Sequence, residues 1–121
     1  MNVSSYKQFF RKVFPPKFVP LVVPVMVSET LYGYAFLCPG CRVRHYVPTG
    51  VSDAEGRRWV FNGDLERPTF SPSLVFHVEH EDRAADVCHL TIVNGMLDYH
   101  LDSTHWLSGE TVKMKQSYEF S

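Results

Sequence analysis

The pair Asn94-Gly95 constrains the fold more than any other feature of the sequence. Both residue types accept positive φ, which the type I′ turn of a two-residue β-hairpin requires at both positions. A turn at this pair fixes the register of the two flanking strands, so that Val93 faces Met96 and Ile92 faces Leu97. Because side chains alternate between the two faces of a strand, each residue near the turn is thereby assigned to a face.

The register of this hairpin points Cys88 and His89 in opposite directions. One face carries Cys88, Leu90, Ile92, Leu97, Tyr99 and Leu101, which is an apolar set suited to a core. The other face carries His89, Thr91, Val93, Met96, Asp98 and His100, which is mostly polar. We therefore expect Cys88 to point into the protein and His89 to point away from it.

The remaining sequence is also typical of strands, since Val, Ile, Thr, Phe and Tyr are frequent and turn residues recur every 8–12 positions. Strands are expected at 21–27, 31–37, 45–47, 59–61, 73–78, 88–93, 96–102 and 110–115, with a rigid loop at Pro68 to Pro72. Ser4 to Phe14 has the spacing of a short amphipathic helix that ends before Pro15-Pro16. The prediction is a mainly β, small single-domain antiparallel β-sandwich or barrel-like fold with a short N-terminal helix.

The length and charge of the chain narrow its class. A chain of 121 residues suits one domain, with 1–16 as an N-terminal helix or arm and 17–121 as a β-rich core. A formal net charge of −1 disfavours a dedicated nucleic-acid binder. No apolar run approaches the roughly 20 residues of a membrane span. The run Phe18 to Val27 is broken by two prolines and is not expected to be a signal peptide. The expected location is the cytoplasm.

Cys38-Pro-Gly-Cys41 follows a β-rich run, and the segment after it also reads as a strand. This context predicts a zinc knuckle, because a tight turn brings two thiolates together and a redox C-x-x-C would open a helix. A closed structural zinc site needs four ligands. Cys88 is the only cysteine left and is the expected third ligand. The fourth is expected among the histidines, with His105 first, His89 second and His45 third.

Catalytic motifs are not recognised in the sequence, so we expect a protein that is not an enzyme. H-x-E at His77 to Glu79 precedes no P-C-x-x-C, and G-x-S-x-G and H-E-x-x-H are absent. The polar residues after the hairpin are expected to serve turns. One alternative is a zinc-dependent hydrolase with an open metal position, in which His89, Asp102 or Glu79 is the base. A second alternative is a nucleic-acid-binding zinc module that uses the arginines near the knuckle.

A second distinctive block runs from Arg57 to Ser73 and contains Asn62-Gly63-Asp64 and Pro-Thr-Phe-Ser-Pro-Ser at 68–73. Its aromatic side chains suit either a core or a contact patch. If the loops of this block form a binding surface, the candidate anchors are Trp59, Arg67 and Phe70.

Six blocks in order give the chain a resemblance to a family of short, uncharacterised bacteriophage and prophage proteins. The matching residues are Phe36, Cys38 to Cys41, His45, Trp59, Asn62 to Asp64, Pro68 to Ser73, Cys88-His89, Gly95, Asp102, Thr104-His105 and Gly109 to Val112. The resemblance covers roughly residues 31–115. Ser103 stands where the family pattern has Cys.

This resemblance implies a cytoplasmic, phage-encoded protein with one structural Zn²⁺. Its simplest ligand set here is Cys38, Cys41, Cys88 and His105, with His89 as the alternate. Members of the family occur beside bacterial ubiquitin-like conjugation genes, which would suit an adaptor. The expected function is therefore binding of a host or phage protein, in an accessory or anti-defence role during infection.

Overall fold

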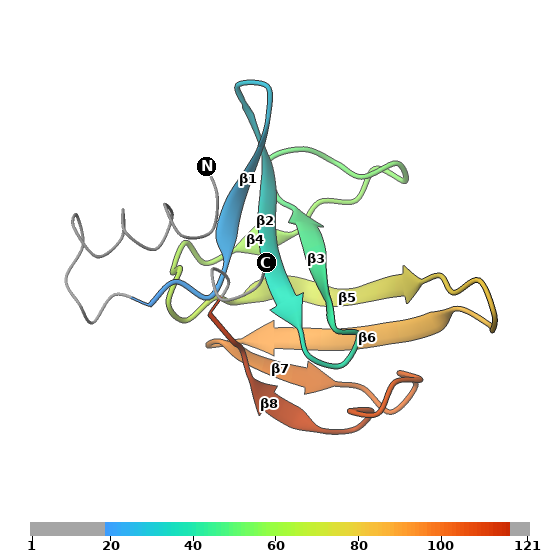
Figure 1. Cartoon of the computed structure of the whole chain (residues 1–121). Coiled ribbons are helices and arrows are strands. Elements are labelled where there is room, and N and C mark those ends of the chain that lie inside the picture. Colours follow the sequence, from blue (N-terminus) through green and yellow to red (C-terminus); the bar gives the residue numbers. More distant parts are fainter. Residues whose placement is uncertain (1–18, 117–121) are drawn as a thin grey trace.

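The computed structural model describes residues 19–116, and within that range the chain forms eight strands and no helix (Figure 1). The strands are β1 (Val23–Val27), β2 (Thr30–Cys38), β3 (Val43–Pro48), β4 (Val60–Phe61), β5 (Phe70–Val78), β6 (Asp86–Val93), β7 (Met96–Tyr99) and β8 (Thr111–Lys113). The mainly β prediction is confirmed. The helix predicted at 4–14 lies outside the described residues.

The strands form two antiparallel sheets, neither of which closes into a barrel. One sheet has the order β1-β2-β3 and the other has the order β4-β5-β6-β7-β8. Figure 1 shows the three-stranded sheet crossing one face of the five-stranded sheet. Among the described residues, no helix is long and apolar enough to serve as a membrane span.

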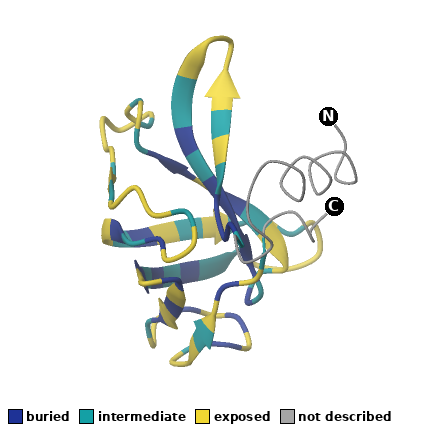
Figure 2. Ribbon diagram, turned by 90° about the vertical axis from the view of Figure 1, so that its left-hand side faces the viewer, coloured by how far each residue is buried: buried dark blue, intermediate teal, exposed yellow. Residues whose placement is uncertain are grey.

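The core lies between the two sheets. It is built from the inward side chains of both, including Phe36 and Val47 from the first sheet and Leu74 and Leu90 from the second, all at most 1% exposed. The tip of the β1–β2 hairpin extends beyond this contact and is exposed (Figure 2). The five-stranded sheet therefore has one covered face and one outer face.

The hairpin predicted at Asn94-Gly95 is present as β6 and β7. Both turn residues have positive φ, 50° and 76°, and Val93 pairs with Met96 as expected. Cys88 is fully buried and His89 is only partly buried, which confirms their opposite directions. Leu101 was expected in the core but is 86% exposed, because β7 ends at Tyr99 and the chain turns away from the sheet.

The segment predicted as a rigid loop at Pro68 to Pro72 instead enters strand β5 at Phe70. The pairing between β5 and β6 shifts register between Phe70 and Leu74, so this stretch of β5 holds extra residues opposite β6. Ser73 lies at the end of this bulge. Regular pairing resumes at Leu74, whose side chain is buried in the core.

Candidate active site and metal centre

Ser73, His89 and Asp102 form a hydrogen-bonded chain on the five-stranded sheet. The Nε2 atom of His89 lies 3.2 Å from the Oγ atom of Ser73. The Nδ1 atom of His89 lies 2.9 Å and 3.0 Å from the two carboxylate oxygens of Asp102. A serine, a histidine and an acid in this order of contacts have the geometry of a catalytic triad, which is recognised by contacts and not by chain order.

The strands place these three side chains together for simple reasons. His89 points outward from β6 because the β6–β7 register turns Cys88 inward. Ser73 comes from the neighbouring strand β5, where Val75 is the direct partner of His89. Asp102 comes from the turn that follows β7.

The segment after Asp102 is held against β6 by four hydrogen bonds. The Ser103 Oγ atom accepts from the His89 N–H at 3.0 Å and donates to the His89 carbonyl at 2.9 Å. The Thr104 N–H donates to the Val87 carbonyl, and the Val87 N–H donates to Thr104 Oγ1, both at 2.9 Å. These contacts fix the backbone on both sides of the His89–Asp102 pair.

The charges of the pair favour an oriented imidazole. The hydrogen bond from His89 holds the pKa of the Asp102 carboxyl below its ordinary value. An ionised Asp102 accepts a hydrogen bond from the Nδ1–H group of His89, which leaves the Nε2 lone pair facing the Ser73 hydroxyl. The side chain of His89 is 22% exposed and that of Asp102 is 66% exposed, so the site is open to solvent.

His100 is a fourth polar residue at this site. Its ring lies 4.0 Å from the His89 ring, centroid to centroid, and its Nε2 atom lies 2.7 Å from Thr91 Oγ1. Donor atoms of His89, His100 and Asp102 lie within 4.8 Å of one another. His100 therefore borders the general-base position without contacting Ser73 through any hydrogen bond of the described structure.

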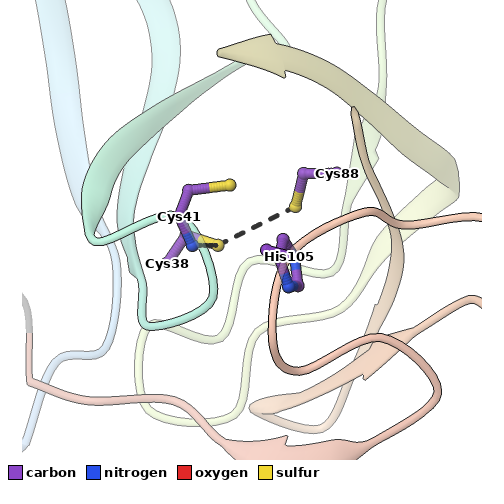
Figure 3. A group of neighbouring side chains, drawn as sticks. All are labelled: Cys38, Cys41, Cys88 and His105. Carbon is purple, nitrogen blue, oxygen red and sulfur yellow. Dashed lines mark hydrogen bonds between the residues drawn. The ribbon is translucent and has the colours of Figure 1, made fainter. Parts of the chain in front are cut away.

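A separate cluster joins Cys38, Cys41, Cys88 and His105 (Figure 3). It lies on the inner side of β6, the strand that carries Cys88 and His89. Their ligand atoms all lie within 4.8 Å of one another, which is compatible with a metal site. Cys38 and Cys41 flank the turn between β2 and β3, which is closed by the Arg42 N–H donating to the Cys38 carbonyl at 2.7 Å. The predicted knuckle is thus a hairpin turn that faces β6.

The spacing of the thiols suits a bound cation. The Sγ atoms of Cys38 and Cys88 are 3.8 Å apart, and two sulfurs bonded to one tetrahedral zinc at ~2.3 Å are also about 3.8 Å apart. Hydrogen bonds from Cys41 and then Cys88 lower the pKa of Cys38, and hydrogen bonding to Cys38 raises the pKa of Cys88. All three thiols can be ionised together only with a positive charge among them.

His105 completes the cluster from the loop after β7. It is 8% exposed, and its Nε2 atom is buried without a hydrogen-bond partner. Its Nδ1 atom meets the Leu107 N–H at 3.2 Å. The ring lies against Gly40, where an added Cβ would stand 2.6 Å from Nε2. The unpartnered nitrogen and the close fit against the knuckle are what a ligand histidine needs.

Tyr99 supports the knuckle from β7. Its hydroxyl lies 3.0 Å from the Cys38 Sγ atom and accepts from the Gly40 N–H at 3.3 Å. The Cys41 N–H also faces Cys38 Sγ, at 3.4 Å. Donors aimed at a sulfur stabilise its thiolate form and hold it in place.

The two sites share their chain segments. Cys88 and His89 are consecutive on β6, and Asp102 and His105 lie on one short loop. The thiol-imidazole cluster and the candidate triad therefore lie on opposite sides of the same two segments. Holding Cys88 near His105 also holds His89 near Asp102.

The other residues singled out from the sequence lie elsewhere. His45, the third-choice ligand, is buried in a stack on Phe76 with ring centroids 3.9 Å apart and is outside the four-residue cluster. Phe70 is 2% exposed and belongs to the core, so its side chain is not available to a partner. Trp59 is half-buried and donates from Nε1 to the Ser73 carbonyl at 3.1 Å. Arg67 is exposed, away from both sites.

Comparison with known proteins adds one decisive observation. A family model described as "Bacterial ubiquitination-like system serine protease (BubE)" matches residues 12–100. The chain belongs to the BubE family. Ser73 and His89 lie inside the matched range, and Asp102 follows it by two residues. No curated protein and no solved structure matches the chain.

Membership of the BubE family corrects the function expected from the sequence. The expectation was a phage-type zinc protein that acts by binding a host or phage macromolecule, with a zinc hydrolase or a nucleic-acid-binding module as alternatives. That expectation is wrong, because the family is one of bacterial serine proteases. The comparison shows a bacterial family and gives no support to a phage origin.

Ser73 is the candidate active-site residue that sequence reasoning missed. The motif Pro-Thr-Phe-Ser-Pro-Ser at 68–73 was interpreted as a rigid loop at Pro68 to Pro72 followed by a strand from Ser73, and no chemical role was given to Ser73. Its last serine is placed on a strand beside an outward histidine by the β5–β6 pairing. One available signal was the alternation of Ser73, Leu74, Val75 and Phe76, which puts Ser73 and the core residue Leu74 on opposite faces.

Proposed function

We propose that this chain is a serine protease of a bacterial ubiquitination-like system, with Ser73 as nucleophile, His89 as general base and Asp102 as the residue that orients His89. The observation that carries this proposal is the continuous contact from Ser73 Oγ through the His89 ring to the Asp102 carboxylate. The family match supports the same chemistry independently.

The reaction uses the triad as follows. Ser73 Oγ attacks an acyl carbon while its proton passes to His89 Nε2, at a starting separation of 3.2 Å. Asp102 stabilises the imidazolium through Nδ1. The Nε2 proton then passes to the leaving group as its bond to the acyl carbon breaks, which leaves an acyl-serine. Water, activated by His89, hydrolyses this ester and restores the Ser73 hydroxyl.

The substrate follows from the system named by the family. A ubiquitination-like system joins the carboxyl end of a ubiquitin-like protein to other groups, so the bond to be cut is an acyl bond at that end. A site open to solvent at Asp102 suits a protein substrate that approaches from outside. We assign the chain the removal or maturation of such a modifier.

The test is covalent labelling combined with cleavage. The full chain is treated with a fluorophosphonate probe, and the labelled peptide is located by mass spectrometry. Cleavage is followed on a ubiquitin-like protein of the same bacterium that carries a C-terminal extension. Labelling at Ser73 and loss of both readouts in Ser73→Ala support the proposal. The matched control is Ser71→Ala, since Ser71 is an exposed serine two residues away in the same motif.

Two results would contradict the triad. One is cleavage that persists in Ser73→Ala at the rate of the unchanged protein. The other is a probe adduct on a residue other than Ser73.

We also propose that Cys38, Cys41, Cys88 and His105 hold one structural zinc. Three thiols and an imidazole are a common ligand set of closed zinc sites, and the unpartnered His105 Nε2 supports this assignment. Bound there, zinc supplies folding free energy and no catalytic step. By joining Cys88 to His105, the metal would fix the separation between β6 and the 102–105 loop.

Elemental analysis and zinc K-edge absorption test the metal assignment. We expect one zinc per chain with three sulfur donors and one nitrogen donor. An oxygen donor in place of nitrogen contradicts the ligand set, and a Tm that does not fall when the metal is removed contradicts the structural role.

A further inference from the structure

Strand β5 has an open edge next to Ser73. Its only partner on the side opposite β6 is β4, which pairs at two positions, Val60 with Ser71 and Phe61 with Phe70. From Pro72 to Val78 no strand of the described range 19–116 pairs with this side. Figure 1 shows β5 running on past β4 toward the loop that leads to β6.

The hydrogen-bonding groups on this edge can be assigned from the neighbouring strand. The carbonyls of Val87 and His89 accept from Thr104 and His100, on the side of β6 away from β5. Because N–H and C=O groups alternate in direction along a strand, Asp86, Cys88 and Leu90 direct theirs toward β5. Their partners there are Val78, Phe76 and Leu74.

It follows that Val75 and His77 direct their N–H and C=O groups to the open edge. Both side chains are exposed, Val75 by 46%. The first carbonyl on this edge belongs to Ser73 and is already taken by the Trp59 indole. The free backbone groups therefore begin just after Ser73.

This edge lacks the usual protection against strand pairing. Natural edges carry Lys, Pro, inward charges or bulges. Here Pro72 lies before Ser73 and the bulge ends at Ser73, and the stretch Leu74 to Val78 (LVFHV) contains no Lys, Arg, Asp, Glu or Pro. An unprotected β-prone edge that begins at a candidate nucleophile indicates a surface used for pairing.

We propose that the substrate binds as an added β-strand along the edge of β5 at Val75 and His77. The occupant is an extended, unstructured segment of the substrate protein, whose backbone supplies the missing hydrogen bonds. A paired strand lies about 4.8 Å from β5, so its backbone passes within reach of Ser73. The Trp59 indole ends the pairing at Ser73, where the chain leaves the edge with its acyl carbon beside Oγ.

This inference rests on the proposed function, and its test separates the two. His77→Pro removes one edge N–H, and a proline whose N–H would face outward is tolerated on an edge strand. His77→Ala removes the same side chain and keeps the N–H. We expect His77→Pro to lower kcat/KM on the extended ubiquitin-like protein at least tenfold, and His77→Ala to stay within twofold of the unchanged protein. Both variants should react with the fluorophosphonate at Ser73 at the normal rate.

Amide hydrogen exchange provides a readout that does not depend on whether His77→Pro folds. In Ser73→Ala protein, a peptide spanning the cleavage junction should slow exchange at Val75 and His77. The amides of Leu74 and Phe76, already bonded to β6, should change little.

The inference is overturned if His77→Pro and His77→Ala cleave equally, or if the peptide protects other segments. It is also overturned if the edge pairs with a second copy, seen as a concentration-dependent dimer that His77→Pro abolishes. A chain that never labels at Ser73 contradicts the proposed function instead.

Discussion

Gly40→Ala should weaken the metal site and leave the rest of the fold unchanged. A Cβ at position 40 would stand 2.6 Å from His105 Nε2 and 2.7 Å from Nδ1, whereas ordinary contact begins at 3.4 Å. Since the Cε1 atom of the ring would stand closer still, the ring must move by at least roughly 0.8 Å. A zinc–nitrogen bond of about 2.0–2.1 Å tolerates a change of only about 0.2 Å. We expect His105 to leave the site while the three thiols remain.

The magnitude follows from the loss of one ligand of four. Changes to residues that merely orient ligands lower metal affinity by about 10–100-fold, so losing the ligand itself should lower zinc affinity at least about 100-fold. At about 1.4 kcal/mol per tenfold, zinc should then stabilise the fold by about 3 kcal/mol less. For a domain of this size that is a fall in Tm of about 10–20 °C.

The assay is competition for zinc with a chelating dye, together with thermal unfolding with and without metal. Pro39→Ala is the matched control, because it alters the same turn and adds no atom against the imidazole. The metal-free forms of all three proteins should unfold at similar temperatures. A Gly40→Ala protein that keeps three sulfur donors and one nitrogen donor at unchanged affinity would refute the assignment of His105.

Three further outcomes are expected. Ser73→Ala should lower kcat by at least about 10³-fold, the usual consequence of losing a nucleophile, and Ser71→Ala should not, as measured on the extended ubiquitin-like protein. Asp102→Asn should lower kcat/KM while Asp98→Asn does not; since the pKa of Asp102 lies below its ordinary value, the carboxylate stays ionised throughout the pH range in which His89 can act as a base, and the difference between Asp102→Asn and the unchanged protein should be seen at every pH of that range. Removing zinc with a chelator should lower both Tm and the rate of Ser73 labelling, because Cys88 and His105 flank the His89–Asp102 pair, and added zinc should restore both.

The sequence alone determined the parts of this protein that depend on local chemistry. Asn94-Gly95 demanded a tight hairpin, because few other residues accept two consecutive positive φ angles. That hairpin set Cys88 inward and His89 outward. The Cys38 to Cys41 spacing required a turn with two thiols on one side. These features need only the conformational preferences of neighbouring residues.

Tertiary structure decided which distant residues meet. Seven residues, 79–85, separate β5 from β6, and a loop of that length does not fix strand register. The sequence therefore could not place Ser73 beside His89. Nor could it show that the Asp102 to His105 loop folds back on β6, since that depends on the Ser103 and Thr104 hydrogen bonds. The candidate triad is built from three segments that come together only when sheet pairing aligns them. For that reason the candidate nucleophile could not be predicted from the sequence, whereas the hairpin and the knuckle could.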